Sequence, residues 1–175
     1  LSRLRSHARK VRAHQEAIEE SLPSLLAAYS KDTSRPILQF FSGKEGLDRI
    51  SDDVLESAQE EILLFSNQRR EQEVFSAADH KEFIKARLDR GISIRVIAPD
   101  SKEARELKKH DKESNRQTLI IPGPEAFTIE TYIYADKIAM LSFDREVIGF
   151  IVQSKEFADA ERWLFEEVWR NHSSR

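Results

Sequence analysis

The chain has 175 residues, of which 39% are hydrophobic and 34% are charged, a composition typical of a folded globular protein. Its net charge of −3 excludes the strongly basic balance of a free-standing nucleic-acid-binding protein. The chain lacks cysteine, so disulfides and thiolate metal sites are excluded, and no apolar run approaches the roughly 20 residues of a membrane span. We therefore expect a cytoplasmic protein with no membrane partner, cofactor or metal.

Apolar residues recur alternately three and four positions apart through the first 29 residues, which is the spacing of a coiled-coil seam. An amphipathic helix packed on its own domain is the alternative interpretation. Pro23 removes a helical hydrogen bond, so the seam is best defined before it, and whether the helix bends there stays open. The pattern predicts a dimerisation helix over residues 1–29 and a homodimer. The expected dimerisation residues are Leu4, Ala8, Val11, Gln15, Ile18 and Leu22.

Residues 30–36 are polar and turn-rich, and we interpret them as a linker to an α/β domain over residues 37–175. In that domain strand-like and helix-like patterns first alternate, which favours parallel strands covered by helices, and then give way to hairpins. Strands are expected at 37–41, 61–66, 92–99, 118–122, 128–134, 137–143 and 147–153. Helices are expected after Ser42, at 77–90, at 101–110 and after Ser154.

Five segments follow one another over nearly the whole chain, namely Leu22–Leu25, Phe41–Gly46, Arg90–Ile97, Ile133–Ala139 and Trp163–Trp169. Together they resemble the effector-binding region of the TrmB family of transcription regulators. The resemblance implies a phospholipase-D-like α/β domain with a mixed sheet flanked by helices, preceded by a coiled-coil helix. It also implies a winged-helix DNA-binding domain before residue 1. No such domain is present in these residues, and the chain begins with Leu1 inside a helical pattern, so we expect a piece of a longer protein.

Phospholipase-D-like enzymes use a His-x-Lys-x-x-x-x-Asp motif, in which the histidine attacks phosphorus and the lysine binds the phosphoryl oxygens. In the predicted hairpin the matching lysine is Lys137, which places Ala135 at the histidine position and Ser142 at the aspartate position. A methyl group cannot form a bond to phosphorus. We therefore expect a catalytically inactive domain with no catalytic residues, and the alternative is a phosphodiesterase or nuclease of the phospholipase D kind.

Ligands of open α/β sheets gather beyond the carboxyl ends of the parallel strands. The predicted ligand-binding residues at that rim are Asn67, Gln68 and Arg69 after one strand and Asp100 after the next, and turn capping is the alternative reading of each. We expect Tyr134 and Lys137 to approach the same cleft if the phospholipase D geometry is kept. A sugar would suit the amides, and a sugar phosphate would suit Arg69.

Other chemistry has little support in the sequence, because the five histidines show no short metal-ligand spacing and no phosphate-binding or nucleophile motif is present. Five cations lie within the first 12 residues, at Arg3, Arg5, Arg9, Lys10 and Arg12. They would suit either a solvated helix surface or phosphate contacts beside the missing DNA-binding domain. The sequence thus favours the effector-sensing and dimerising region of a TrmB-like regulator. A pure assembly module without a small ligand stays an alternative.

Overall fold

The computed structural model describes residues 36–72, 74–122, 129–143 and 146–173. The predicted dimerisation helix over residues 1–29 therefore lies outside the described residues, and so do residues 30–35 of the predicted linker. The six seam residues named above fall in the same segment.

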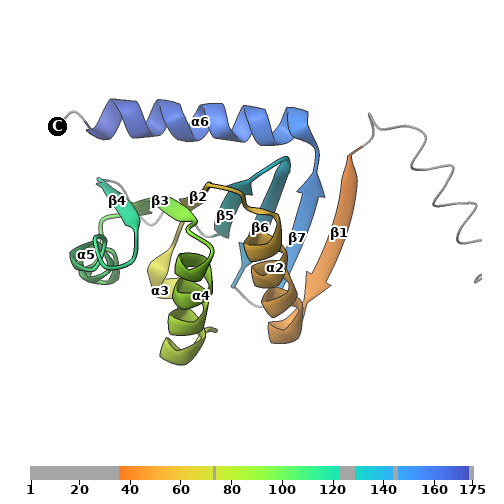
Figure 1. Cartoon of the computed structure of the whole chain (residues 1–175), viewed down its shortest axis with the longest axis horizontal. Coiled ribbons are helices and arrows are strands. Elements are labelled where there is room, and N and C mark those ends of the chain that lie inside the picture. Colours follow the sequence, from red (N-terminus) through yellow and green to blue (C-terminus); the bar gives the residue numbers. More distant parts are fainter. Residues whose placement is uncertain (1–35, 73, 123–128, 144–145, 174–175) are drawn as a thin grey trace, which may run out of the picture. The chain divides into compact units, whose positions relative to one another are not determined.

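A mixed seven-stranded sheet in the order β1-β7-β6-β5-β2-β3-β4 forms the centre of the described residues (Figure 1). Strands β2, β3 and β4 run parallel, whereas β5 is antiparallel to β2 and continues into the antiparallel set β6, β7 and β1. This confirms the predicted change from parallel strands to hairpins. The strands are β1 (Ile37–Ser42), β2 (Glu61–Phe65), β3 (Ser93–Pro99), β4 (Arg116–Ile121), β5 (Ile129–Tyr134), β6 (Lys137–Ser142) and β7 (Ile148–Gln153).

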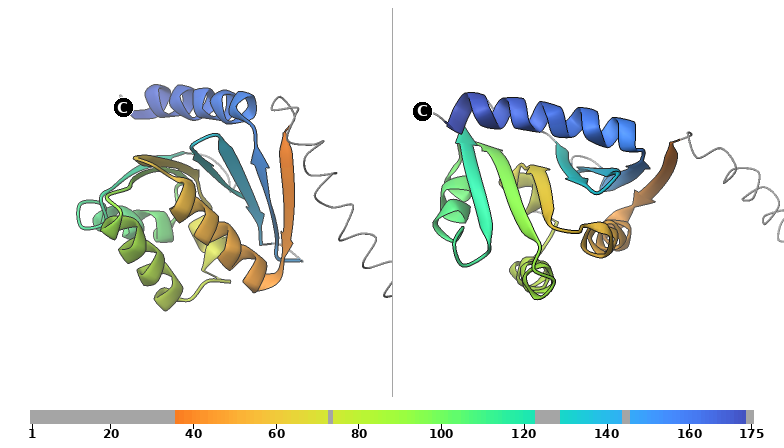
Figure 2. Two further views of the ribbon diagram at one scale, coloured as in Figure 1. Left: turned by 45° about the vertical axis from the view of Figure 1, so that its right-hand side comes forward. Right: turned by 45° about the horizontal axis from the view of Figure 1, so that its top comes forward.

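Helices flank both faces of the sheet, as predicted. Helix α6 lies across one face, and α2 and α4 lie on the other (Figures 1 and 2). The sequence patterns missed α3, because its four polar residues offer no apolar period from which a helix is recognised. The helices are α2 (Gly43–Ser57), α3 (Gln68–Glu71), α4 (Ala77–Asp89), α5 (Lys102–Lys109) and α6 (Lys155–Ser173).

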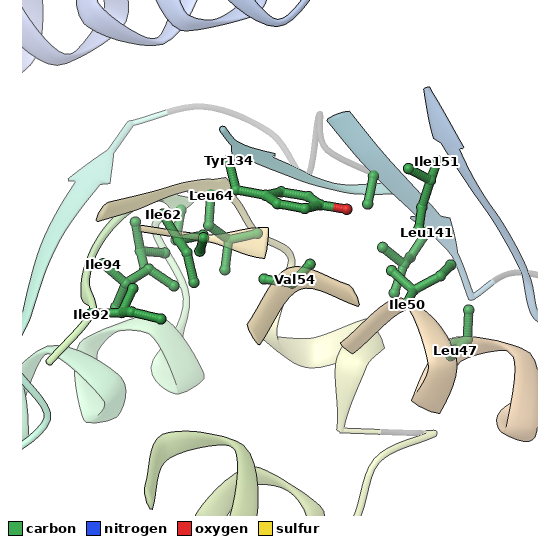
Figure 3. Close-up of a cluster of buried hydrophobic side chains, with 14 of the residues drawn as sticks. Leu47, Ile50, Val54, Ile62, Leu64, Ile92, Ile94, Tyr134, Leu141 and Ile151 are labelled. Carbon is green, nitrogen blue, oxygen red and sulfur yellow. The ribbon is translucent and has the colours of Figure 1, made fainter. Parts of the chain in front are cut away.

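Two hydrophobic cores follow from the alternation of side chains along the strands. In β2, Ile62 and Leu64 point into the larger core under α2 and α4, whereas Leu63 points into a smaller core with Phe165 of α6. The larger core surrounds the buried ring of Tyr134 (Figure 3). Each sheet face is thus covered by its own helical layer, and polar side chains that face either layer are withdrawn from water.

Local sequence explains where the helices begin and how closely they pack. Ser76 precedes α4 and forms a reciprocal capping box with Asp79, which satisfies backbone donors that the first turn leaves free. Gly149 of β7 lies directly under α2, and a Cβ built there would come within 2.4 Å of the Cδ1 atom of Ile50. A larger residue at this position would force the side chain of Ile50 to move, so glycine favours the close approach of this helix to the sheet.

Arg95 of β3 ties α6 to its face of the sheet. Its guanidinium group donates hydrogen bonds to Glu61 at 2.9 and 2.8 Å and to Glu166 of α6 at 3.1 and 2.5 Å. It also lies 5.5 Å from the ring centroid of Phe165 and 5.3 Å from that of Trp169. These carboxylates raise the pKa of Arg95 above its ordinary value, the hydrogen bonds to Glu166 contributing most.

Among the helices of the described residues, none is both long enough and apolar enough to span a bilayer.

Candidate functional site

Polar side chains meet at the edge of the sheet where β2 and β3 end. Ser66 and Asn67 follow β2 directly, and both are buried, with exposed fractions of 0% and 6%. Strand β5 is antiparallel to β2, and Phe65 pairs with Thr131, so β5 begins at this same edge. Glu130 enters the edge from that side, while Glu71 of α3 and His80 of α4 reach it from the helical layer.

Glu130 is the most completely buried carboxylate at this edge, with an exposed fraction of 0%. Ser66 Oγ donates a hydrogen bond to one of its oxygens at 2.7 Å, and the hydroxyl of Tyr132 donates to the other at 3.3 Å. Burial raises the pKa of Glu130 well above its ordinary value, and the negative charge of Glu71 raises it further. The hydroxyl of Tyr132 is affected in the same way, since burial and the two carboxylates raise its pKa.

His80 connects this buried group to the surface. Its Nδ1 donates to the carbonyl oxygen of Ser76 at 3.0 Å, because a carbonyl can only accept a hydrogen bond. Its Nε2 lies 3.1 Å from Oε1 of Glu71. The carboxylate of Glu71 raises the pKa of His80, in spite of the opposing effect of burial. Glu71, His80 and Glu130 therefore form a chain of interacting titratable groups from the sheet to the start of α4.

A groove of about 400 Å³ opens above these residues, between α2 and α4. This volume is within the range of roughly 300–1,000 Å³ that is usual for small-molecule sites. Tyr132 and Leu141 of the sheet form its floor, and Leu55, Phe75 and Phe83 add apolar walls. The groove thus has an apolar base, and Glu71 and His80 line one part of it.

Negative charge predominates on the walls of the groove. Among the described residues, six carboxylates line it, against the guanidinium group of Arg90 and the imidazole of His80. Lys44 bridges Asp48 of α2 and Asp79 of α4, with a nitrogen–oxygen distance of 3.3 Å to each, and offsets part of that charge. The remaining carboxylates are Asp52, Glu56, Glu71 and Glu82.

The predicted ligand-binding residues after β2 and β3 are not brought into this groove. Asn67 is buried at the strand edge, Gln68 begins α3, and Arg69 lies exposed on that helix. Asp100 is exposed beyond β3 and accepts hydrogen bonds from Arg105 at 2.7 and 2.6 Å, which lower its pKa. Asp100 is therefore engaged in an exposed ion pair with Arg105, next to Ser101, which caps α5. The assignment of these four residues to a ligand stays a prediction.

Tyr134 and Lys137 lie at the opposite end of the strands, near the start of β2. Tyr134 is the last residue of β5, and the pairing of Leu63 with Ile133 places it beside the start of β2. Five residues of β2 and its extension separate that level from Asn67, which is about 16 Å along an extended strand. The two sets of predicted ligand-binding residues therefore do not share a cleft, because the antiparallel direction of β5 carries its end away from the rim.

Both side chains contact α2. The hydroxyl of Tyr134 donates to Oδ2 of Asp53 at 2.8 Å, and Lys137 Nζ donates to Oδ1 of Asp53 at 2.7 Å and to Oγ of Ser57 at 2.9 Å. Burial, followed by the hydrogen bond to Asp53, raises the pKa of Tyr134. Lys137 thus anchors the end of α2 to the β5–β6 hairpin, a structural role that the sequence did not reveal.

The hairpin accommodates the phospholipase D motif in two registers, and neither contains its histidine. In the predicted register Ala135 takes the histidine position, and the structure places it in the β5–β6 turn with φ of 45°. A second register ends at Asp136 and assigns Ile129 and Thr131 to the histidine and lysine positions. This second register lies along β5 and begins at the edge that holds Glu130.

Sequence patterns missed the residues that the structure gathers here. Glu130 offered a usable signal, because it alternates with Tyr132 and Tyr134 and so shares their inward face of β5. Glu71 and His80 gave no such sequence signal, because their proximity to Glu130 depends on how α3 and α4 lie over the sheet.

Comparisons with known proteins gave no matching family model and no match among curated proteins. Solved structures do match. TrmBL2, an archaeal chromatin protein whose structure is described as showing a novel mode of DNA binding, aligns with a TM-score of 0.55 and 17% identity. The alignment covers 96% of this chain and 66% of TrmBL2, so the chain spans about two thirds of that protein's length.

Two further structures are similar. NucT from Helicobacter pylori aligns with a TM-score of 0.58 and 14% identity over 76% of this chain and 95% of NucT. A polyphosphate kinase from Porphyromonas gingivalis aligns with a TM-score of 0.54 and 10% identity over 77% of this chain and 23% of the kinase. At these identities the similarity establishes the fold. The chain therefore has a phospholipase-D-like α/β fold, which it shares with TrmBL2 and with NucT.

Proposed function

We propose that this chain is the effector-sensing and dimerising region of a TrmB-like transcription regulator and that it lacks phosphodiesterase activity. Its partner in the homodimer is a second copy of the chain, and DNA is bound by a winged-helix domain that precedes it in the longer protein. The observation on which the proposal mainly depends is the alignment with TrmBL2 over 96% of the chain. No membrane partner or cofactor forms part of the proposal.

The motif positions support the absence of catalysis. Phosphoryl transfer of the phospholipase D kind requires a nucleophile, and alanine or isoleucine occupies the histidine position in the two registers of the hairpin. Lys137 is engaged by Asp53 and Ser57 at the end of α2. What remains of such a fold is its capacity to bind, and the α2–α4 groove offers the volume and the apolar lining for a small molecule.

A thermal-melting screen tests the sensing role. Purified chain is melted with sugars, sugar phosphates, organic acids and organic amines, each in excess. A ligand of the folded state at 100 times its dissociation constant adds about 2.7 kcal/mol to the free energy of unfolding, so a true effector raises the melting temperature clearly. If no class raises it, the chain is an assembly module without a small-molecule ligand.

A nuclease or phosphodiesterase is the second candidate, because NucT shares the fold over 95% of its length. We expect the purified chain to release no nitrophenol from bis(p-nitrophenyl) phosphate above the background rate. Turnover that is lost in Lys137→Ala but kept in Tyr134→Phe would establish the nuclease instead. Tyr134→Phe is the matched control, since it removes a hydrogen bond to the same Asp53 but leaves the lysine in place.

A further inference from the structure

The groove between α2 and α4 is unsuited to the sugar phosphate that Arg69 suggested in the sequence. A phosphate carries negative charge, and the groove lining that the structure describes holds six carboxylates against one arginine and one histidine. Lys44 neutralises part of this charge at the end where both helices begin, by its contacts with Asp48 and Asp79. Placing an anion on the remaining wall would bring like charges together, which weakens binding.

Carboxylates without an ion pair remain on both walls of the groove. Asp52 and Glu56 lie one helical turn apart on α2, and Glu82 lies on α4. Within the part of the chain that the structure describes, no ion pair involves any of these three side chains. Their negative charge is therefore available to a cation that lies between the two helices.

The apolar lining of the groove indicates the chemical nature of the rest of the ligand. This lining consists of Tyr132 and Leu141 on the floor and of Leu55, Phe75 and Phe83 on the walls, so it is largely aromatic. An apolar body buried there leaves water, and a cation close to aromatic faces is attracted by their electron density. A ligand that matches both the carboxylates and this lining has a hydrophobic body and a positive end.

We propose that the α2–α4 groove binds an organic ammonium ion with an apolar body. This inference rests on the proposed function, since it names the chemical class of the effector. The ammonium group lies between Asp52 of α2 and Glu82 of α4, and the body packs on Tyr132 and Phe83.

Isothermal titration of the 1–175 chain at pH 7 and low salt tests the proposal with two probes of similar shape. Tryptamine carries an indole and an ammonium group, and indole-3-propionate carries the same ring and a carboxylate. We expect tryptamine to bind in the micromolar to millimolar range, and indole-3-propionate to bind at least roughly tenfold more weakly. Because exposed charges are screened by salt, tryptamine should bind several-fold more weakly at 0.5 M NaCl.

A pair of charge-matched variants locates the site. Asp52→Asn combined with Glu82→Gln removes two carboxylates from the groove, and we expect roughly tenfold weaker tryptamine binding. Asp89→Asn combined with Glu156→Gln makes the same change in net charge at exposed positions outside the groove and should leave the affinity unchanged. Melting curves of both variants show whether they are folded.

Three results would overturn the proposal. They are tighter binding of the carboxylate probe, equal loss of affinity in both double variants, and no heat of binding with tryptamine at millimolar concentration. None of them decides the proposed function. If a sugar or an organic acid raises the melting temperature, the chain is a sensor with a different ligand. If the chain turns over a phosphodiester and this depends on Lys137, the proposed sensing function itself is wrong.

Discussion

Glu130 shows how strongly a single side chain can depend on the sheet around it. The same residue in a loop would be an ordinary exposed carboxylate, but the alternation of β5 turns it inward beside Ser66. The groups that face it are Glu71 of α3, Ser66, Tyr132 and the backbone of Asn67. Its ionised form is therefore poorly solvated and repelled by Glu71, and both effects raise the pKa of Glu130 in the folded chain.

The stability of the fold should consequently fall as the pH rises. A carboxyl group whose pKa is raised by folding contributes stability below its unfolded pKa and loses that contribution as the pH passes its folded pKa. His80, which faces Glu71 and Asp79, has a raised pKa and acts in the same direction. We expect the free energy of unfolding in urea to decrease between pH 5 and pH 8.

Glu130→Gln should remove part of this dependence. The amide stays neutral at every pH and still accepts the hydrogen bond from Ser66, so the variant should exceed the wild type by about 1 kcal/mol or more at pH 8. At pH 5 the two should differ little. Glu156→Gln, at an exposed position of α6, serves as control and should follow the wild-type curve. A variant that is destabilised equally at both pH values would show that the carboxylate acts only as a hydrogen-bond acceptor.

At the scale of elements, Arg95 of β3 contributes more to holding α6 on the sheet than the exposed ion pairs on the surface of α6 do. Arg95 has an exposed side-chain fraction of 18% and joins Glu61 of β2 to Glu166 of α6 while it stacks near two aromatic rings. By contrast, Arg170 forms a single exposed ion pair with Glu167 on the same helix. Partly buried, multiply bonded charges contribute more than exposed pairs do.

Arg95→Met should therefore destabilise the domain by about 2 kcal/mol, since it leaves two carboxylates without their partner. Arg95→Lys should recover only part of this loss, because an ammonium group cannot bond both carboxylates in the same forked geometry. Arg170→Met is the control and should change stability by less than about 0.5 kcal/mol. Urea unfolding followed by the fluorescence of the tryptophans of α6 measures all three. Equal effects of Arg95→Met and Arg170→Met would contradict the assigned role of Arg95.

Lys137, at the β5–β6 turn, shows that a sequence motif does not reveal which helix a residue will contact. In the sequence Lys137 matched one position of a catalytic motif, but in the fold it fixes the end of α2 through Asp53. The sequence contained the residues, but their pairing over 84 positions depends on α2 lying across the hairpin. Sequence patterns are informative about neighbours within a few residues, and a contact of this separation is decided by packing.

For the whole molecule, the dimer remains a prediction of the heptad pattern in residues 1–29. We expect light scattering of the 1–175 chain at micromolar concentration to give twice the chain mass. Val11→Glu combined with Ile18→Glu places two charges in the predicted seam, and it should give a monomer, since buried like charges repel across the interface.

Ala13→Glu combined with Ala17→Glu adds the same charges to the same segment at positions outside the seam, and it should remain a dimer. A monomeric wild-type chain would contradict the prediction. So would dimers in both double variants, because the interface would then lie elsewhere.

The sequence by itself determined the alternation of helices and strands, the change from parallel strands to hairpins, and the missing histidine of the motif. These are local properties, because apolar periodicity, capping residues and motif spacing act within a few residues. Tertiary structure alone decided that Tyr134 and Lys137 lie at the edge opposite Asn67, and that Glu71, His80 and Glu130 meet beside the α2–α4 groove. The reason is physical, since strand direction and helix placement follow from the burial of both faces of the sheet at once. That condition belongs to the assembled layers and is not present in any short segment of the chain.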